Sequence, residues 1–241
     1  QQKRIAELAE KVHSGQIANG AGEKFTTVVQ IGIGGSDLGP RAMYLALENW
    51  AKVNNTFKMK AEFISNVDPD DAAAVLSNID VAHSLFVLVS KSGTTLETLT
   101  NESFVKDALV KAGLNPSNHM IAVTSETSPL AKSADYLAAF FMDDYIGGRY
   151  SSTSAVGGAV LSLAFGPEVF AQFLNGAATA DAIAKNKDLY YNALGQAQKG
   201  WHEGEADVVP FIKYLLGSYN LVFINDFALN FNILGLITKS S

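Results

Sequence analysis

Continuous apolar runs alternate with segments of helical periodicity along residues 25–140 of this chain. Each run ends in glycines or small hydroxylated residues, and apolar positions at helical spacing follow. Three units show the pattern most clearly: FTTVVQIGIGG before SDLGPRAMYLALENWAK, HSLFVLVS before KSGTTLETLTNESFVKDALVKAG, and NHMIAVTS before ETSPLAKSADYLAAF. Runs rich in Val and Ile, buried on both faces and followed by helices, are typical of parallel sheets.

A fourth unit extends this pattern. The run KAEFISN at residues 60–66 precedes DPDDAAAVLSNI, in which Asp68 or Asp70 would cap a helix and Pro69 would lie in its first turn. We therefore predict an α/β fold with a doubly wound sheet of about five parallel strands. Such sheets bind ligands at the carboxyl ends of their strands, where the loops of these units lie.

The character of the sequence changes after Asp143. The segment YIGGRYSSTSAVGGAVLSLAF is a turn rich in glycine and serine that leads into an apolar helix. From residue 189 onward the pattern is aromatic and helical, with no further strand–helix unit. We predict one domain over residues 1–187 and a helical tail over residues 188–241.

Composition narrows the class of protein. With 241 residues, 48% of them hydrophobic and 17% charged, the chain is long and apolar enough to bury a core. Its net charge of −6 argues against nucleic-acid binding, which needs clustered positive charge. The absence of cysteine excludes disulfides and thiolate metal sites and fits a reducing, cytoplasmic location.

No membrane span is expected. The most apolar long stretch, residues 215–237, is interrupted by several polar and charged side chains that a span of about 20 residues tolerates poorly. They are Asn220, Asn225, Asp226, Asn230 and Asn232.

The motif IGIGGSDLGP at residues 31–40 resembles a dinucleotide fingerprint only in part. Gly32 and Gly34 fit the pattern, but Asp37 stands where the third glycine belongs, and the next strand ends in Ser65 and Asn66 rather than in an acid. The chain also lacks the phosphate-loop pattern of nucleotide triphosphatases. What is left is a tight glycine turn with Ser36 at a helix N-terminus, where Ser36 either caps the helix or contacts a bound ligand.

The loop SKSGTT at residues 90–95 is the strongest candidate for a ligand site. Free N–H groups and the helix dipole favour an anion at the start of the following helix. One hydroxyl would suffice to cap that helix, yet four are present, with a glycine that allows close approach and a lysine that adds charge. They are Ser90, Lys91, Ser92, Gly93, Thr94 and Thr95.

Other chemically capable residues are less specific. Arg149 lies between a Gly-Gly turn and a serine run, where its planar guanidinium could bind an oxyanion or form a surface ion pair. The four histidines, His13, His83, His119 and His202, have no metal-site spacing. The runs DPDD and MDDY are typical of helix caps and solvated turns.

Taken together, three of these segments resemble the phosphoglucose isomerase family. VVQIGIGGSDLGPRAMYLAL, FVLVSKSGTTLETLTN and DDYIGGRYSSTSAVG stand in that family's order and at its separation, and the resemblance runs from about residue 5 to about residue 187. It implies the sugar isomerase (SIS) fold, a three-layer sandwich with a flavodoxin-like sheet. The implied reaction interconverts glucose 6-phosphate and fructose 6-phosphate, with no cofactor, and the implied assembly is a homodimer.

Site residues follow by position from this resemblance. Gly35 and Ser36 would contact the sugar phosphate, and Arg149 would stabilise the cis-enediolate intermediate. The phosphate cradle would consist of Ser90, Lys91, Ser92, Thr94 and Thr95, with Gly93 giving close approach.

The resemblance stops short of a complete active site. The family's base is a glutamate in a motif like M-E-S-N-G-K, assisted by a histidine and a C-terminal lysine, and this sequence has no match to them. The tail segment LYYNALGQAQKGWHEGEADVVPFIKYLLG resembles the C-terminal helical segment of Fic-domain proteins but lacks their H-P-F-x-x-G-N-G-R loop. Within it, His202, Glu203 and Glu205 form either an acid–base cluster or a solvated turn.

Three functions are therefore compared. The first is a phosphoglucose isomerase of which this chain holds the phosphate-binding half. The second is a non-catalytic sugar-phosphate-binding SIS module, favoured by the absent base. The third, an NAD-dependent enzyme, is disfavoured by the missing third glycine and acid.

Overall fold

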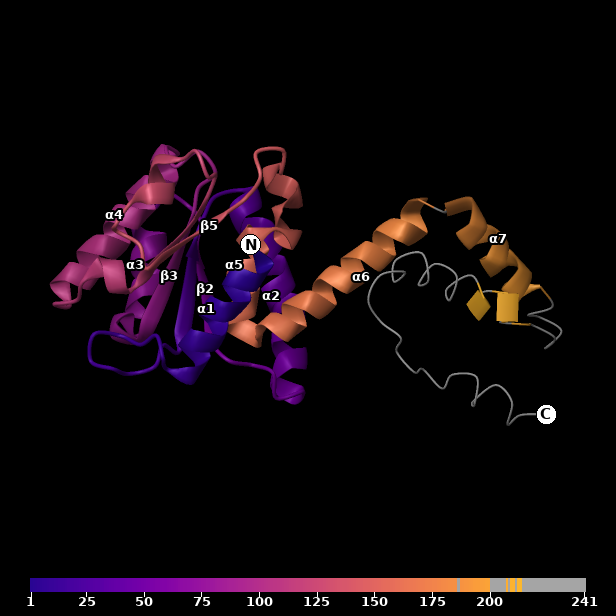
Figure 1. Cartoon of the computed structure of the whole chain (residues 1–241), viewed down its shortest axis with the longest axis horizontal. Helices are drawn as coiled ribbons and strands as arrows, with labels where there is room; N and C mark the ends of the chain where they lie inside the picture. Colours follow the sequence, from indigo (N-terminus) through magenta and orange to yellow (C-terminus); the bar gives the residue numbers. More distant parts are fainter. Residues whose placement is uncertain (186, 200–206, 208, 211, 214–241) are drawn as a thin grey trace. The chain divides into compact units, whose positions relative to one another are not determined.

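The computed structural model describes residues 1–185, 187–199, 207, 209–210 and 212–213, and its contacts divide the chain into two compact units, 1–173 and 174–241. The first unit is built on a five-stranded parallel sheet in the order β2-β1-β3-β4-β5 (Figure 1). The strands are β1 (Thr27–Ile31), β2 (Lys60–Ile64), β3 (Ser84–Val89), β4 (Met120–Thr124) and β5 (Ala138–Phe141). The predicted α/β fold with a flavodoxin-like sheet is confirmed.

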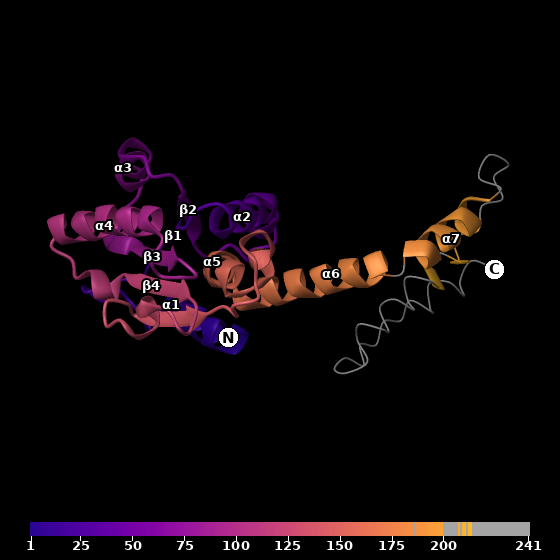
Figure 2. The ribbon, with the colours of Figure 1, turned by 90° about the horizontal axis from the view of Figure 1, so that it is seen from above.

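Helices cover both faces of the sheet. On one face lie α3 (Pro69–Ser77) and α4 (Leu96–Lys111), and on the other lie α1 (Gln2–Ser14), α2 (Gly35–Val53) and α5 (Ala155–Phe165), as Figures 1 and 2 show. β1, β3 and β4 are buried along their whole length, because each is covered on both faces. The sequence patterns that predicted α2 and α4 are confirmed.

The side chains of β1 alternate between the two helical layers. Val29 and Ile31 belong to the apolar cluster formed with α3 and α4, in which Val105 and Leu109 are fully buried. Gln30 therefore faces the opposite layer, since neighbouring side chains of a strand point to opposite faces. Asp68 caps α3 as predicted, because its Oδ1 accepts a hydrogen bond from the Asp70 amide at 2.9 Å.

One predicted helix is wrong. The segment ETSPLAKSADYLAAF forms only the short 3-10 helix η3 (Pro129–Lys132), which Ser128 caps, and then the fifth strand. Without β5, the side of β4 away from β3 would be a free edge with a row of unpaired backbone groups. β5 pairs with that edge in register from Ile121↔Ala138 to Thr124↔Phe141, which satisfies these groups.

The second unit is described only in part. α6 (Pro167–Lys185) runs across the division at residue 173, and α7 (Lys187–Gln198) follows it. The boundary predicted between residues 187 and 188 stays a prediction. His202, Glu203, Glu205 and the stretch 215–237 lie outside the described residues. Among the helices that the structure does describe, none has the length and hydropathy needed to span a bilayer.

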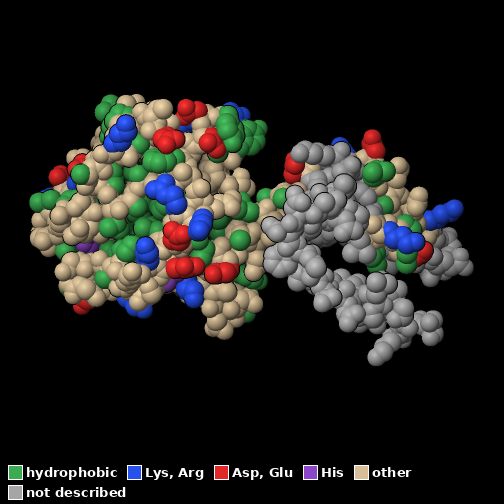
Figure 3. Space-filling view, in the orientation of Figure 1, with side chains coloured by type: hydrophobic (Ala, Val, Ile, Leu, Met, Phe, Trp, Pro, Cys, Tyr) green, Lys and Arg blue, Asp and Glu red, His purple; other side chains and the backbone are tan. Residues whose placement is uncertain are grey.

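Charges are mixed over the surface. On the face shown in Figure 3, acidic and basic side chains of the described residues are interspersed.

An electrostatic cluster lies near the amino ends of β1 and β3, where the ring of His83 bonds Asp80 Oδ2 at 2.8 Å and Glu23 Oε2 at 3.0 Å. His83 belongs to the short helix η1 (Val81–His83), and Glu23 to the connection before β1. This histidine thus ties two segments that are distant in sequence.

The His83 cluster predicts a pH dependence of stability. The pKa of His83 is raised above its ordinary value of 6.5, chiefly by the hydrogen bond to Asp80. A raised pKa stabilises the fold fully below the unfolded pKa, and this contribution is lost as pH rises through the folded pKa. Urea titrations should show that His83→Gln is less stable than the unsubstituted protein at pH 6, and that the difference shrinks above pH 6.5 toward pH 9.

His13 provides the matched control for this experiment. Burial lowers the pKa of His13, so its contribution is lost as pH falls rather than as it rises. The difference between the unsubstituted protein and His13→Gln should therefore change in the opposite direction. A pH-independent difference for His83→Gln would contradict the electrostatic reading of the cluster.

Candidate functional site

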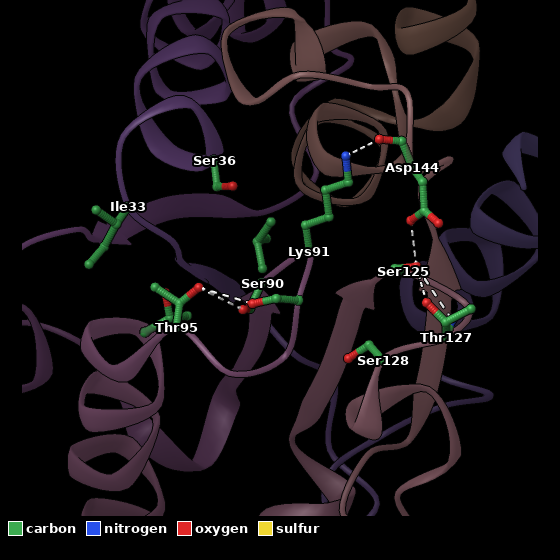
Figure 4. A pocket seen from close by; sticks show the side chains of 12 residues that line it. Ile33, Ser36, Ser90, Lys91, Thr95, Ser125, Thr127, Ser128 and Asp144 are labelled. Atoms are coloured by element: carbon green, nitrogen blue, oxygen red, sulfur yellow. Dashed lines mark hydrogen bonds between the residues drawn. The ribbon is translucent and has the colours of Figure 1, made fainter.

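A cavity of about 480 Å³ opens at the carboxyl ends of the strands, beside the point where the strand order reverses between β1 and β3. Doubly wound sheets bind their ligands at such a switch point, and the volume lies within the range of small-molecule sites. Figure 4 shows the residues around it. The lining residues are Ile33, Ser36, Val89, Ser90, Lys91, Ser92, Thr95, Thr98, Ser125, Thr127, Ser128 and Asp144.

The loop between β3 and α4 supplies a group of hydroxyls on one side of this cavity. Ser90 Oγ donates to Thr95 Oγ1 at 3.3 Å, and Ser92 Oγ lies 3.4 Å from the same oxygen. Both distances are long for hydroxyl pairs, which prefer about 2.7–2.8 Å. Three hydroxyls therefore surround one position with weak mutual bonds, an arrangement that a stronger acceptor such as an anion would improve.

The amino terminus of α4 adds positive potential at the same position. Thr95 is the N-cap residue of α4, yet its side chain caps no amide of that helix within the described residues. The first-turn N–H groups thus keep their capacity to bind an anion, and the helix dipole favours negative charge there. The first turn also contributes Thr98, which lines the cavity although the residue is only 2% exposed.

Lys91 lines the cavity, but its ammonium group is engaged with the protein. It donates to the carbonyl oxygen of Asp144 (Figure 4) and, at 3.1 Å, to that of Ile146. Lys91 therefore connects the hydroxyl-rich loop to the segment after β5. Its charge stays at the cavity wall, close to where we expected a compact anion.

The glycine at residue 93 has a role that the sequence did not reveal. Gly93 has φ of +68°, and a side chain there would collide with Ser128 Oγ and approach Leu130 Cγ to 3.0 Å. This glycine therefore gives room to the loop after β4. Neither Gly93 nor Thr94 lines the cavity.

The loop after β4 carries lining residues that the sequence analysis did not single out. Ser125 Oγ donates to Asp144 Oδ1 at 2.7 Å and lies 3.0 Å from Thr127 Oγ1. The sequence did offer a signal for them, since the third apolar run, NHMIAVTS, ends in hydroxylated residues like the other two. Asp144 follows β5, a strand that the sequence analysis did not locate, so its approach to Ser125 could not be foreseen.

The turn between β1 and α2 forms the opposite wall. Gly34 has φ of +59°, a left-handed conformation that favours glycine, and it is the N-cap residue of α2. The expectation of Ser36 as a serine cap is therefore wrong, since α2 begins at Gly35 and Ser36 lies inside its first turn. The other role considered for Ser36, a contact to a bound ligand, stays a prediction, and Ser36 does line the cavity.

An ion pair fixes the same turn from outside the cavity. Asp37 Oδ1 lies 2.9 Å from the Arg41 guanidinium, which also donates to Ser65 Oγ at 3.0 Å. Burial raises the pKa of Asp37 above its ordinary value, while the charge and hydrogen bond of Arg41 oppose that shift. Arg41 thus links the first turn of α2 to the carboxyl end of β2.

The segment that carries Arg149 packs directly on this turn. A side chain at Gly35 would collide with the carbonyl group of Gly148 and come within 2.7 Å of the Arg149 amide nitrogen. Ser151 Oγ closes the contact by donating to the Gly35 carbonyl at 3.1 Å. Gly35 is therefore required for close approach of two backbones.

Arg149 itself is not a lining residue of the cavity. Its side chain is exposed, and its guanidinium forms neither an ion pair nor a hydrogen bond with any described residue. The structure thus brings Ser36, Ser90, Lys91, Ser92 and Thr95 together around one cavity. It holds the backbone of Arg149 next to Gly35.

The contact at Gly35 predicts a large effect of a single methyl group. Gly35→Ala should lower the free energy of unfolding by about 1–3 kcal/mol, as overpacking does in tight interiors. Gly20→Ala is the control, because nothing lies within 4 Å of a side chain at that position, and its effect should stay within about 0.5 kcal/mol. Urea unfolding measures both. Equal stabilities for the two variants would contradict this prediction, because they would mean that residues 148 and 149 can shift to accommodate the methyl group without loss of stability.

Comparison with known proteins gives one consistent family. Residues 1–193 match the family model described as phosphoglucose isomerase. The glucose-6-phosphate isomerase of Treponema denticola is 63% identical over 191 residues, which are 79% of this chain and 36% of that protein. That of Desulfotalea psychrophila is 42% identical over 223 residues, 92% of this chain and 38% of that protein, so this match reaches into residues 188–241.

A solved structure agrees with these relatives. The crystal structure of a glucose-6-phosphate isomerase from Chlamydia trachomatis has a TM-score of 0.67 and 45% identity, over 76% of this chain and 33% of that one. The chain thus spans little more than a third of the length of the curated relatives it matches. The strand order, the polar cavity at its switch point and the match over residues 1–193 lead to one conclusion: this chain belongs to the phosphoglucose isomerase family.

Proposed function

We propose that this chain carries the phosphate-binding part of a glucose-6-phosphate isomerase, an enzyme that interconverts glucose 6-phosphate and fructose 6-phosphate. One observation carries the proposal. The hydroxyls of Ser90, Ser92 and Thr95 converge at 3.3–3.4 Å in front of the uncapped amino terminus of α4. A phosphate dianion accepts several hydrogen bonds and is favoured by the helix dipole, so it fits this position.

Residues on both sides of the cavity have roles in this proposal. Of the residues proposed for the cradle, Ser90, Lys91, Ser92 and Thr95 line the cavity, whereas Thr94 and Gly93 belong to the same loop without lining it. Ser36 lines the opposite wall, and Gly35 beside it allows the backbone of residues 148 and 149 to pack on the same turn. The walls are lined by hydroxyls, which suit the phosphate end of a sugar phosphate and its polar hydroxyl groups.

Arg149 is the proposed electrostatic catalyst. Aldose–ketose exchange moves a proton between C1 and C2, and negative charge develops on the oxygens of the enediolate. A guanidinium that no described residue neutralises can stabilise that charge with its planar fork. The contact of its backbone with Gly35 holds it near the turn that carries Ser36.

The proton-transfer groups are the missing part. The sequence has no match to the glutamate motif, the histidine or the lysine that the family uses. We therefore propose that these 241 residues bind the sugar phosphate and that full catalysis requires residues beyond them. A cytoplasmic location and a homodimeric assembly belong to the same proposal.

Binding should depend on the phosphate group. At a ligand concentration of about 100 Kd, fructose 6-phosphate should add about 2.7 kcal/mol to the free energy of unfolding if only the folded state binds. Unphosphorylated fructose should add nothing measurable. The double variant Ser90→Ala/Thr95→Ala should lose this ligand-dependent gain, because it removes two of the three converging hydroxyls. Urea titrations with and without ligand give the measurement.

A matched double variant separates lost binding from lost stability. Ser77→Ala/Thr100→Ala also removes two hydroxyls, each of which donates only to a carbonyl of its own helix, and neither lines the cavity. It should keep the full gain from fructose 6-phosphate relative to its own baseline. Equal gains from fructose and fructose 6-phosphate would refute the phosphate cradle.

Although we expect the chain to bind the sugar phosphate, we expect it to catalyse the isomerisation only slowly. General acid–base catalysis contributes about 10²–10⁴-fold, so the chain should isomerise fructose 6-phosphate at least about 100-fold more slowly than the full-length Treponema denticola relative. A coupled assay that detects glucose 6-phosphate compares the two proteins. Binding without turnover would also fit a sugar-phosphate-binding SIS module. Turnover equal to that of the relative, lost on His202→Ala or Glu203→Gln, would instead make the tail catalytic.

A further inference from the structure

A glutamine occupies the middle of the most buried part of the sheet. β1 is buried throughout, and Gln30 is 1% exposed between Val29 and Ile31, which are fully buried. An amide in such a place costs free energy unless its polar atoms are hydrogen-bonded. Apolar residues dominate central parallel strands. A polar side chain at this position therefore calls for a specific reason.

The side chain of Gln30 reaches the first turn of α2. Its Nε2 donates to the carbonyl oxygen of Ser36 at 2.6 Å. Its Oε1 is buried and has no hydrogen-bond partner among the described residues. The amide is thus held by one bond only, and that bond ends on a residue that lines the cavity.

The Ser36 carbonyl needs this donor because of the sequence of α2. In an α-helix the carbonyl of residue 36 would accept from the amide of residue 40. Residue 40 is Pro40, which lies inside α2 and has no N–H group. The carbonyl therefore lacks its usual helical donor, and Gln30 supplies the hydrogen bond that the proline removes.

The bond also fixes the position of Ser36 relative to the strand. The Ser36 amide donates to the Ile33 carbonyl at 3.2 Å, so this residue is held at both its backbone N–H and its C=O. A side chain at Gly32 would lie 2.9 Å from the Ser36 carbonyl oxygen and 3.0 Å from its Cβ, so strand and turn are in close contact. Small changes in this turn would move the Ser36 hydroxyl relative to the cavity.

We propose that Gln30 is a positioning residue for the ligand site. Its buried amide replaces the helical donor that is missing at Pro40 and so holds Ser36 against the cavity. The unpaired Oε1 is the stability cost of this arrangement. The inference rests on the proposed function only in that the ligand is taken to be a sugar phosphate.

The test is a double-mutant cycle between residues 30 and 40. Gln30→Met keeps the length of the side chain and removes the donor. Pro40→Ala restores a backbone N–H that can bond the Ser36 carbonyl. Gln30→Met should weaken fructose 6-phosphate binding about 3- to 10-fold, the range expected for one hydrogen bond, as measured by calorimetry. Its unfolding free energy should change little, because removing the unpaired Oε1 offsets the cost of leaving the Ser36 carbonyl without a donor.

Rescue distinguishes positioning from packing. In the double variant Gln30→Met/Pro40→Ala, affinity should return to within about twofold of the unsubstituted protein, and Pro40→Ala alone should bind normally. A simple packing defect at residue 30 would not be repaired at residue 40. A loss of affinity that Pro40→Ala fails to restore overturns the proposal, as does unchanged affinity in Gln30→Met.

A second readout needs no ligand. The amides of Asp37 and Leu38 donate to the Gly34 carbonyl at 3.0 and 2.9 Å, so they report on the first turn of α2. Their hydrogen exchange should be about 3- to 10-fold faster in Gln30→Met and normal in the double variant. If the unsubstituted protein binds no phosphate ester, the proposed function fails. Exchange then still decides the role of Gln30, and equal rates in all variants reject it.

Discussion

No side chain fits between Gly35 and the backbone of residues 148 and 149, and the arrangement of the site depends on this contact. It joins the turn after β1 to the segment after β5, although more than a hundred residues separate them. Lys91 makes a second connection, from the loop after β3 to the carbonyls of Asp144 and Ile146. Three loops at the carboxyl end of the sheet are therefore fixed relative to each other, by a close backbone contact at Gly35 and by the Lys91 side chain.

Part of the polar lining of the cavity is only weakly hydrogen-bonded. The bonds from Ser90 and Ser92 to the Thr95 hydroxyl are long, and α4 starts without a side-chain cap. Gln30 keeps one unpaired oxygen in the interior. Asp68 and Ser154 cap α3 and α5, whereas α1 and α2 also begin without a side-chain cap. Weakly bonded hydroxyls and a helix amino terminus without a side-chain cap thus occur together at the cavity, which is the physical argument for an anion-binding site.

The local sequence determined most of the fold. Buried Val- and Ile-rich runs predicted four of the strands, and helical periodicity predicted α2 and α4, because each element presents its own apolar pattern. β5 escaped prediction, since its four residues, AAFF, carry no distinct period. Its conformation follows from the free edge of β4, with which it pairs. That edge exists only once the sheet is assembled.

The sequence by itself also determined the candidate chemistry: an excess of hydroxyls at residues 90–95, a glycine turn before α2 and an isolated arginine at residue 149. Only the tertiary structure decided what joins them. It brought Ser125, Thr127, Ser128 and Asp144 to the cavity and directed Lys91 to backbone carbonyls. It also paired Gln30 with the carbonyl that Pro40 leaves free. These are contacts between residues far apart in the chain or on different elements, and no local pattern encodes them, because parallel strands meet at one edge only after the sheet has formed.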